Sequence, residues 1–168
     1  MINKFNFLFV TMFGLGKVKI IPGTFGSLAT VIILYICFHI LDINSNLIFL
    51  GILIIFLYSF IAIANHTKNI ENKDPREIII DEFIGQSIPI YLYEISHGTD
   101  KQSDQAIIFY GVFFVLFRYF DIMKPFPVSY FDKKHKNSFG VIMDDVCAGF
   151  YVVLSLICFM ILKNYILS

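Results

Sequence analysis

Two pairs of adjacent acidic residues stand inside otherwise apolar stretches: Asp81-Glu82 and Asp144-Asp145. Charged side chains in such surroundings are costly, and they usually face a protein interior or pair with other charged groups. A carboxylate set without cysteine or histidine favours a hard cation, Mg²⁺ first and then Mn²⁺. The simpler alternative is that helix N-termini stabilise these acids through the helix dipole. For both pairs, the pattern favours a metal site over that alternative.

A third segment combines two basic residues with an acid: Arg118, Asp121 and Lys124, followed by Pro125. Arg118 and Asp121 are three residues apart, so they share a helix face and can pair. We expect Pro125 to end that helix. One interpretation is an interfacial salt bridge with a snorkelling lysine. The other is a pair of phosphate-binding cations with Asp121 on a metal. The pattern alone does not separate the two.

A short turn-forming segment, residues 22–27, precedes the first long apolar stretch. Its proline and two glycines permit a tight turn, and Thr24 or Ser27 is a candidate N-cap for the helix that follows. Free backbone N–H groups at a helix N-terminus attract phosphate. A plain turn with a helix cap explains the same residues, and the Lys-Ser/Thr ending of a P-loop is missing.

The composition indicates a membrane protein. Of the 168 residues, 57% are apolar and only 15% are charged, whereas soluble domains have about a quarter charged residues. The formal net charge is zero, so nothing favours a nucleic-acid partner. The length fits one domain over residues 1–168, and residues 1–13 are expected to form a retained, interfacial or packed helix.

Five stretches are candidates to cross the membrane as helices, which need about 20 apolar residues each: 27–41, 47–64, 78–93, 106–120 and 146–162. The third contains both Asp81 and Glu82 as well as Pro89, so it is either a span or a half-buried helix. We therefore predict an all-α, multi-pass helical bundle with four or five spans.

If the five stretches cross a bilayer one after another, most of the basic residues fall on one side of it. One side receives residues 1–26, 65–80 and 118–145, which hold eleven of the thirteen Lys and Arg; only Lys101 and Lys163 fall on the other side. The positive-inside rule makes the first side cytoplasmic. The acids also gather there, so we predict a metal-assisted phosphoryl-transfer site at the cytoplasmic ends of the spans, at the depth of lipid headgroups.

The four segments together resemble the phosphatidylglycerophosphatase A family of bacteria. That family has a Pro-Gly-Thr-x-Gly-Ser turn, an Asp-Glu-Phe-Ile-Gly segment, an Arg-x-x-Asp-x-x-Lys-Pro segment and a late Asp-Asp-x-x-Ala-Gly segment. Here they stand at 22–27, 81–85, 118–125 and 144–149, in the family's order. The resemblance covers roughly residues 14–165. It departs at Lys17-Val18-Lys19, where relatives are usually less basic.

The resemblance implies Mg²⁺-dependent hydrolysis of phosphatidylglycerophosphate to phosphatidylglycerol and orthophosphate. It also implies a multi-pass protein of the bacterial cytoplasmic (inner) membrane whose active site faces the cytoplasm. The stretch 130–135 is similar to the family as well, which adds Asp132 and His135 as second-rank candidates.

The expected roles follow from these arguments. Metal ligands are expected among Asp81, Glu82, Asp144 and Asp145. Phosphate-binding groups are expected among Arg118, Lys124, Thr24, Ser27 and His135. Catalytic groups are expected among Asp81, Glu82, Asp121 and Asp145. Asp121 or Glu82 is a candidate general base, and an aspartyl-phosphate intermediate is the alternative to direct attack by water. The oligomeric state stays open.

Two other classes of protein are alternatives. Intramembrane acids also mark the ion pathway of a small cation transporter, but that function predicts acids near the bilayer midplane and a polar route to both sides. A lipid synthase of the CDP-alcohol phosphotransferase type is the second, and its spaced Asp-Gly…Ala-Arg…Gly…Asp…Asp signature is not present.

Overall fold

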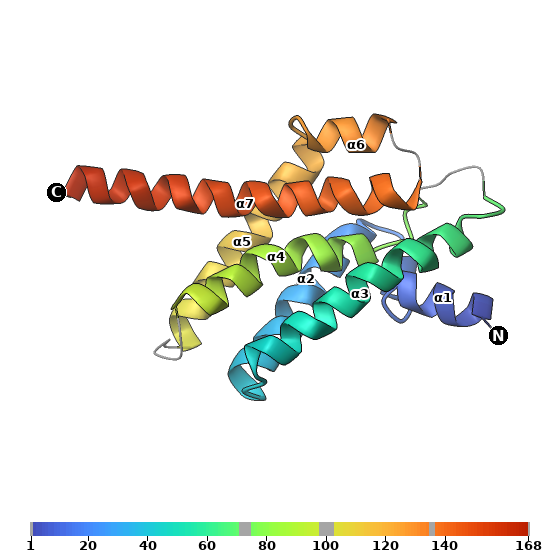
Figure 1. Ribbon diagram of the computed structural model, residues 1–168, viewed down its shortest axis with the longest axis horizontal. Coiled ribbons are helices and arrows are strands. Elements are labelled where there is room, and N and C mark those ends of the chain that lie inside the picture. The colour runs from blue at the N-terminus through green and yellow to red at the C-terminus, as the bar shows by residue number, and fades with distance from the viewer. Residues whose placement is uncertain (1, 71–74, 98–102, 135–136, 168) are drawn as a thin grey trace.

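The computed structural model describes residues 2–70, 75–97, 103–134 and 137–167, and every regular element within them is helical (Figure 1). The all-α prediction is confirmed. The elements are α1 (Ile2–Val10), η1 (Leu15–Lys17), α2 (Pro22–Tyr35), the π-helical turn η2 (Ile36–Ile40), α3 (Ser45–His66), α4 (Ile80–His97), α5 (Ser103–Met123), α6 (Val128–Lys134) and α7 (Ser138–Leu167).

Among the described residues, four helical segments are long and apolar enough to cross a membrane: Pro22–Ile40, Ser45–His66, Gln105–Met123 and Ser138–Ile166. They correspond to four of the five predicted stretches and confirm a multi-pass bundle. Large apolar side chains stay exposed on them, among them Ile54, Leu57 and Leu154. In a membrane such side chains face lipid, so their exposure is not a defect of packing.

The remaining predicted stretch, residues 78–93, forms α4, which is not among those four segments because it contains too many polar residues. It contacts α2, α3, α5 and α7, and Figure 1 shows it lying among them. Far from Asp81 and Glu82, its Glu94 accepts a hydrogen bond from the Tyr110 hydroxyl at 3.0 Å and lies 3.2 Å from His39 Nε2. Because His39 ends the first span and Tyr110 begins the third, α4 runs between the same two ends of the bundle as its neighbours.

The closest helix contact joins α4 to α7 through two glycines. A Cβ atom on Gly85 would stand 2.5 Å from the Asp145 carbonyl oxygen and 2.7 Å from the Phe117 ring. A Cβ atom on Gly149 would collide with the Gly85 carbonyl oxygen. Small residues allow helix backbones to approach this closely in membranes. The two glycines therefore permit a close approach that presses the acid-bearing turns of α4 and α7 together.

The N-terminal helix covers the end of the bundle where the acids lie. α1 packs on α3, where the Tyr58 hydroxyl donates to Asn6 Oδ1 at 2.6 Å. Next to the start of α4, the Ile79 N–H donates to the Val10 carbonyl at 3.0 Å. The expected packed helix at residues 1–13 is present as α1, and it fixes the segment that leads into Asp81.

Candidate active site

Three carboxylates meet where α4 and α7 touch. Asp81 and Glu82 occupy the first turn of α4, and Asp145 lies in the second turn of α7. One oxygen from each of the three lies within 4.8 Å of the others. Asp81 and Asp145 are only 6% and 4% exposed, and Glu82 is nearly as enclosed. Adjacent residues diverge by about 100° around a helix, and the two acids of α4 can approach one point in space because they lie in its first turn.

The acids of α7 lie deeper in their helix than predicted. We expected Asp144 and Asp145 to precede the last span, but α7 begins at Ser138 and contains both. Its 30 residues extend about 45 Å, more than the roughly 30 Å hydrocarbon core, so a helix with polar first turns still has length to cross.

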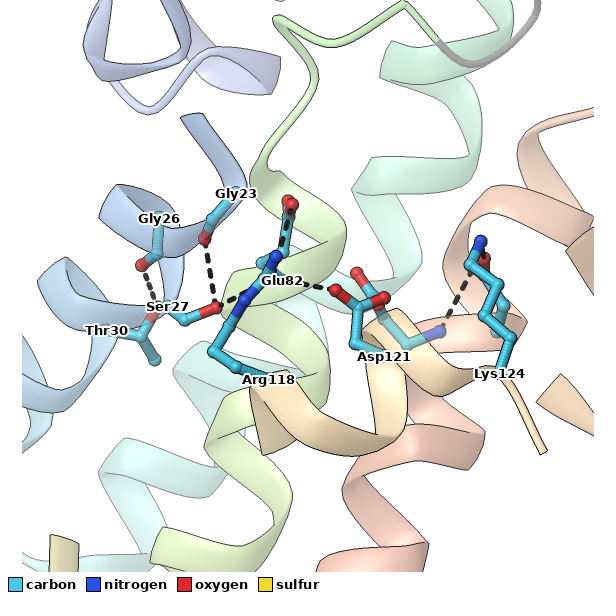
Figure 2. Close-up of polar contacts among 10 residues, drawn as sticks. Gly23, Gly26, Ser27, Thr30, Glu82, Arg118, Asp121 and Lys124 are labelled. Carbon is cyan, nitrogen blue, oxygen red and sulfur yellow. Dashed lines mark hydrogen bonds and ion pairs between the residues drawn. The ribbon is translucent and has the colours of Figure 1, made fainter. Parts of the chain in front are cut away.

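Arg118 of α5 connects the acids to the start of α2 (Figure 2). Its Nη1 lies 2.8 Å from Asp121 Oδ2 and 3.9 Å from Glu82 Oε1, and it donates to the Ser27 hydroxyl at 3.5 Å. The predicted Arg118–Asp121 pair on one helix face is therefore present. Figure 2 shows the guanidinium between these partners, pointing into the space that they enclose.

Asp144 differs from its neighbour in its contacts. Its Oδ2 lies 3.0 Å from Lys124 Nζ, and its Oδ1 accepts the Asp145 backbone N–H at 3.1 Å. It is not in the group of three carboxylates found among the described residues. Adjacent residues diverge by about 100° around a helix, and the acids of α7 lie inside the helix rather than at its end, so the two point to different partners. Of the four predicted metal ligands, Asp144 therefore lies outside the group that the other three form.

Residues 22–27 form the first turns of α2 instead of a loop with a polar cap. The N-cap is Ile21, in the left-handed conformation (φ 46°), and no side chain of the described residues caps the helix. The expectation that Thr24 or Ser27 caps it is wrong, because Pro22 already starts the helix. The Ser27 hydroxyl instead donates to the Gly23 carbonyl at 3.0 Å while it accepts from Arg118. Thr24 is half-buried and does not line the cavity described next.

A cavity of about 590 Å³ holds this chemistry, and it is lined by Ile21, Pro22, Gly23, Arg76, Ile78, Asp81, Glu82, Arg118, Asp121, Ile122, Lys124, Asp144 and Asp145. A Cβ atom at Gly23 would meet the end of the Glu82 side chain, so a larger residue there would displace the Glu82 carboxylate. Arg76 is a functional candidate that the sequence did not reveal. From the sequence it was only one of the basic residues on the cytoplasmic side, because it lies in a loop and belongs to none of the four motif segments. Ile21, strained in a conformation that β-branched residues rarely adopt, carried no sequence signal at all.

Among the described residues, five carboxylates and three cations line the cavity, an excess of two formal negative charges. Buried carboxylates side by side repel one another unless a proton or a cation compensates them. His135 lies outside the described residues, and so does the side chain of Asp132, so their predicted contribution stays a prediction.

Comparison with known proteins identifies the chain's relatives. The family model described as phosphatidylglycerophosphatase A matches residues 8–160. The chain belongs to the phosphatidylglycerophosphatase A family. A phosphatidylglycerophosphatase A of Haemophilus influenzae is 37% identical over 142 residues, which cover 84% of this chain and 80% of that protein. One of Escherichia coli is 33% identical over 139 residues, covering 82% of this chain and 73% of that protein.

A third relative carries a different name. It is a putative phosphatidylinositol-3-phosphatase of Bacteroides thetaiotaomicron, 32% identical over 142 residues, which cover 84% of each protein. No solved structure matches the chain. Membership of the phosphatidylglycerophosphatase A family makes the protein a membrane-embedded phosphatase and does not favour the cation transporter considered from the sequence.

Proposed function

We propose that the protein hydrolyses phosphatidylglycerophosphate to phosphatidylglycerol and orthophosphate, using Mg²⁺ held by Asp81, Glu82 and Asp145. The observation that carries the proposal is the group of three carboxylates within 4.8 Å of one another, in one cavity with Arg118. A phosphatase needs both charges: anionic ligands for a cation and a cationic group for the phosphate oxygens.

The donor set fits a small hard cation. All three groups offer oxygen, and the cavity's excess of two negative charges matches one divalent ion. Glu82 Oε2 is buried and has no hydrogen-bond partner among the described residues, which is unusual for a carboxylate oxygen. When bound, Mg²⁺ supplies Lewis-acid polarisation of a phosphoryl oxygen and lowers the pKa of a bound water.

The chain's own residues bind and orient the phosphate. Arg118 is directed by Asp121 and Ser27, so its remaining N–H groups point into the cavity toward the phosphate oxygens. Lys124, on the Asp144 side, contributes a second positive charge. Because Asp121 pairs with Arg118 at 2.8 Å, we assign it to positioning that guanidinium and assign proton removal from water to Glu82.

In the proposed reaction, the oxygen of a water molecule bonds to phosphorus while the bond between phosphorus and the terminal glycerol oxygen breaks. The water gives up a proton, and the departing glycerol oxygen takes one up. The products are orthophosphate and phosphatidylglycerol, so atoms and charge balance without a further reactant.

We place the enzyme in the cytoplasmic membrane of a bacterium, with the cavity facing the cytoplasm. The basic residues support this orientation, because Lys17, Lys19, Lys68, Arg76 and Lys124 all belong to the end of the bundle that holds the acids. The phosphate group of a lipid substrate can reach a site at that depth while its acyl chains stay in the bilayer.

Release of orthophosphate from phosphatidylglycerophosphate by the purified protein tests the proposal. We expect activity that needs Mg²⁺, disappears with EDTA, and falls at least hundredfold in Asp145→Asn, as for loss of one essential group. Asp42→Asn is the matched control, since Asp42 is exposed and lies between α2 and α3, away from the cavity. Full activity in Asp145→Asn would remove that residue from the site.

The name of the Bacteroides relative supplies a second candidate substrate, phosphatidylinositol 3-phosphate. The same assay with that lipid decides between them. A higher kcat/KM for phosphatidylglycerophosphate supports the proposal, and a higher value for the inositol lipid replaces it with the alternative.

A further inference from the structure

A second cavity adjoins the active-site cavity and has a different charge. It measures about 490 Å³ and is lined by Gly16, Lys17, Val18, Lys19, Pro22, Pro75, Arg76 and Glu77. Pro22 and Arg76 line both cavities, so the two are neighbours that share a wall. The three cations come from two chain segments, the one before α2 and the one before α4.

The positive charge of this basic pocket is available to a ligand. Its one acid, Glu77, is held by His66, with Nε2 and Oε1 3.0 Å apart. Lys17 Nζ lies 4.6 Å from the centre of the Phe7 ring. Lys19 and Arg76 form no ion pair among the described residues, and both are exposed. An unpaired guanidinium beside an ammonium group suits a phosphate.

The segment that supplies the lysines has the character of a membrane interface. Its basic residues alternate with apolar ones that are unusually exposed: Val18 is 37%, Ile20 72% and Ile21 60% accessible. Apolar side chains this exposed next to lysines are typical of a segment that inserts into the headgroup region of a bilayer. The basic pocket is therefore lined by a segment suited to the headgroup region and also adjoins the active-site cavity.

We infer that this basic pocket binds the phosphodiester group of the substrate's headgroup while the phosphomonoester occupies the active-site cavity. The inference rests on the proposed function. In phosphatidylglycerophosphate the order of groups is acyl chains, glycerol, phosphodiester, second glycerol and phosphomonoester. The diester thus lies one glycerol away from the scissile phosphate, and the basic pocket likewise adjoins the active-site cavity across the wall formed by Pro22 and Arg76. Arg76, in the shared wall, can reach either phosphate, whereas Lys19 serves the diester alone.

Two soluble inhibitors test the pocket directly. Glycerophosphoglycerophosphate, the deacylated headgroup, carries both phosphates, and glycerol 3-phosphate carries only the monoester. In neutral detergent micelles we expect Lys19→Gln to raise the KM for phosphatidylglycerophosphate and the Ki of the two-phosphate inhibitor about threefold, and Lys17→Gln/Lys19→Gln about tenfold. The Ki of glycerol 3-phosphate and kcat should change less than twofold.

Lys68→Gln is the matched control, because Lys68 is exposed near the same end of the bundle and lines neither cavity. Equal changes in both Ki values, in the lysine variants or in this control, would mean general attraction of anions and would overturn the inference. So would unchanged Ki values in the double variant.

A neighbouring anionic lipid is the other possible source of a phosphodiester. If the lysine variants lose activity only in vesicles that contain phosphatidylglycerol, and not in neutral micelles, the pocket binds bulk lipid and the inference is overturned. Failure of the wild-type protein to hydrolyse phosphatidylglycerophosphate would instead reject the proposed function, so the two failures are distinguishable.

Discussion

At the scale of single residues, the most informative pair is Asp144 and Asp145. They are neighbours in the chain, equally buried and identical in chemistry, yet their partners differ. Asp145 meets the two acids of α4, whereas Asp144 meets a cation, Lys124. A carboxylate among carboxylates needs a metal or a proton, and one beside an ammonium group does not. The same substitution at the two positions should therefore have different consequences.

We predict that Asp145→Asn lowers the Mg²⁺-dependent activity at least hundredfold, whereas Asp144→Asn does not alter the Mg²⁺ requirement. Asp144→Asn should lower kcat by roughly tenfold, because Lys124 loses the partner that orients it. The Mg²⁺ concentration for half-maximal activity should then stay within about twofold of the wild-type value. A large rise in that concentration for Asp144→Asn would make Asp144 a metal ligand after all.

Arg118 is the second residue whose contacts specify its role. One guanidinium bonds Asp121 and Ser27, lies near Glu82 and still faces the cavity. A lysine keeps the charge but has a single, non-planar head. We predict that Arg118→Lys lowers kcat about hundredfold, the magnitude typical of losing one group that stabilises transition-state charge. Lys163→Arg, in the last turns of α7, is the control and should be neutral; wild-type kcat in Arg118→Lys would exclude the role.

At the scale of helices, the site depends on how closely α4 approaches α7. Gly85 and Gly149 allow that approach, and the three carboxylates lie one turn away from it, at residues 81, 82 and 145. Every metal ligand in the proposal belongs to these two helices. Their separation therefore sets the distance between the oxygens of α4 and α7, which is the quantity that a small cation discriminates.

We predict that Gly85→Ala weakens Mg²⁺-dependent activity more than tenfold and lowers the free energy of unfolding by about 1–3 kcal/mol, the usual cost of an overpacked contact. Gly111→Ala is a matched control, since no atom of the described residues lies within 4 Å of a Cβ atom there and alanine favours helix. Activity in detergent and thermal unfolding of both variants give the comparison. Wild-type behaviour of Gly85→Ala would mean that the helices can separate without cost to the site.

Sequence reasoning reached much of this arrangement, and its failures have physical causes. The two acid pairs predicted the carboxylates of the site, because charge in an apolar stretch is a local signal. The helix starts at Pro22 and Ser138 were missed, since a membrane segment is recognised by apolar residues and its polar first turns resemble loops. The separate partners of Asp144 and Asp145 depend on which helix faces each one, and no local signal encodes that.

At the scale of the whole molecule, α4 decides the topology. In the part of the chain that the structure describes, four segments meet the length and apolarity of a membrane span. α4 does not, yet it runs between the same two ends of the bundle. Its polar residues are tolerated because α2, α3, α5 and α7 surround it and shield it from lipid. With α4 the helices pass five times between the two ends, so the segment before α2 and the end of α7 should lie on opposite sides of the membrane.

We predict that a cysteine at position 68 is labelled by a membrane-impermeant thiol reagent only from the cytoplasmic side, and one at position 163 only from the other side. The measurement uses Lys68→Cys and Lys163→Cys in a background that lacks Cys37, Cys147 and Cys158, the three natural thiols. Right-side-out and inverted membrane vesicles expose the two sides separately. If both cysteines are labelled from the same side, the chain crosses an even number of times. In that case α4 does not span, and the charge asymmetry that places eleven basic residues on the acid side has another origin.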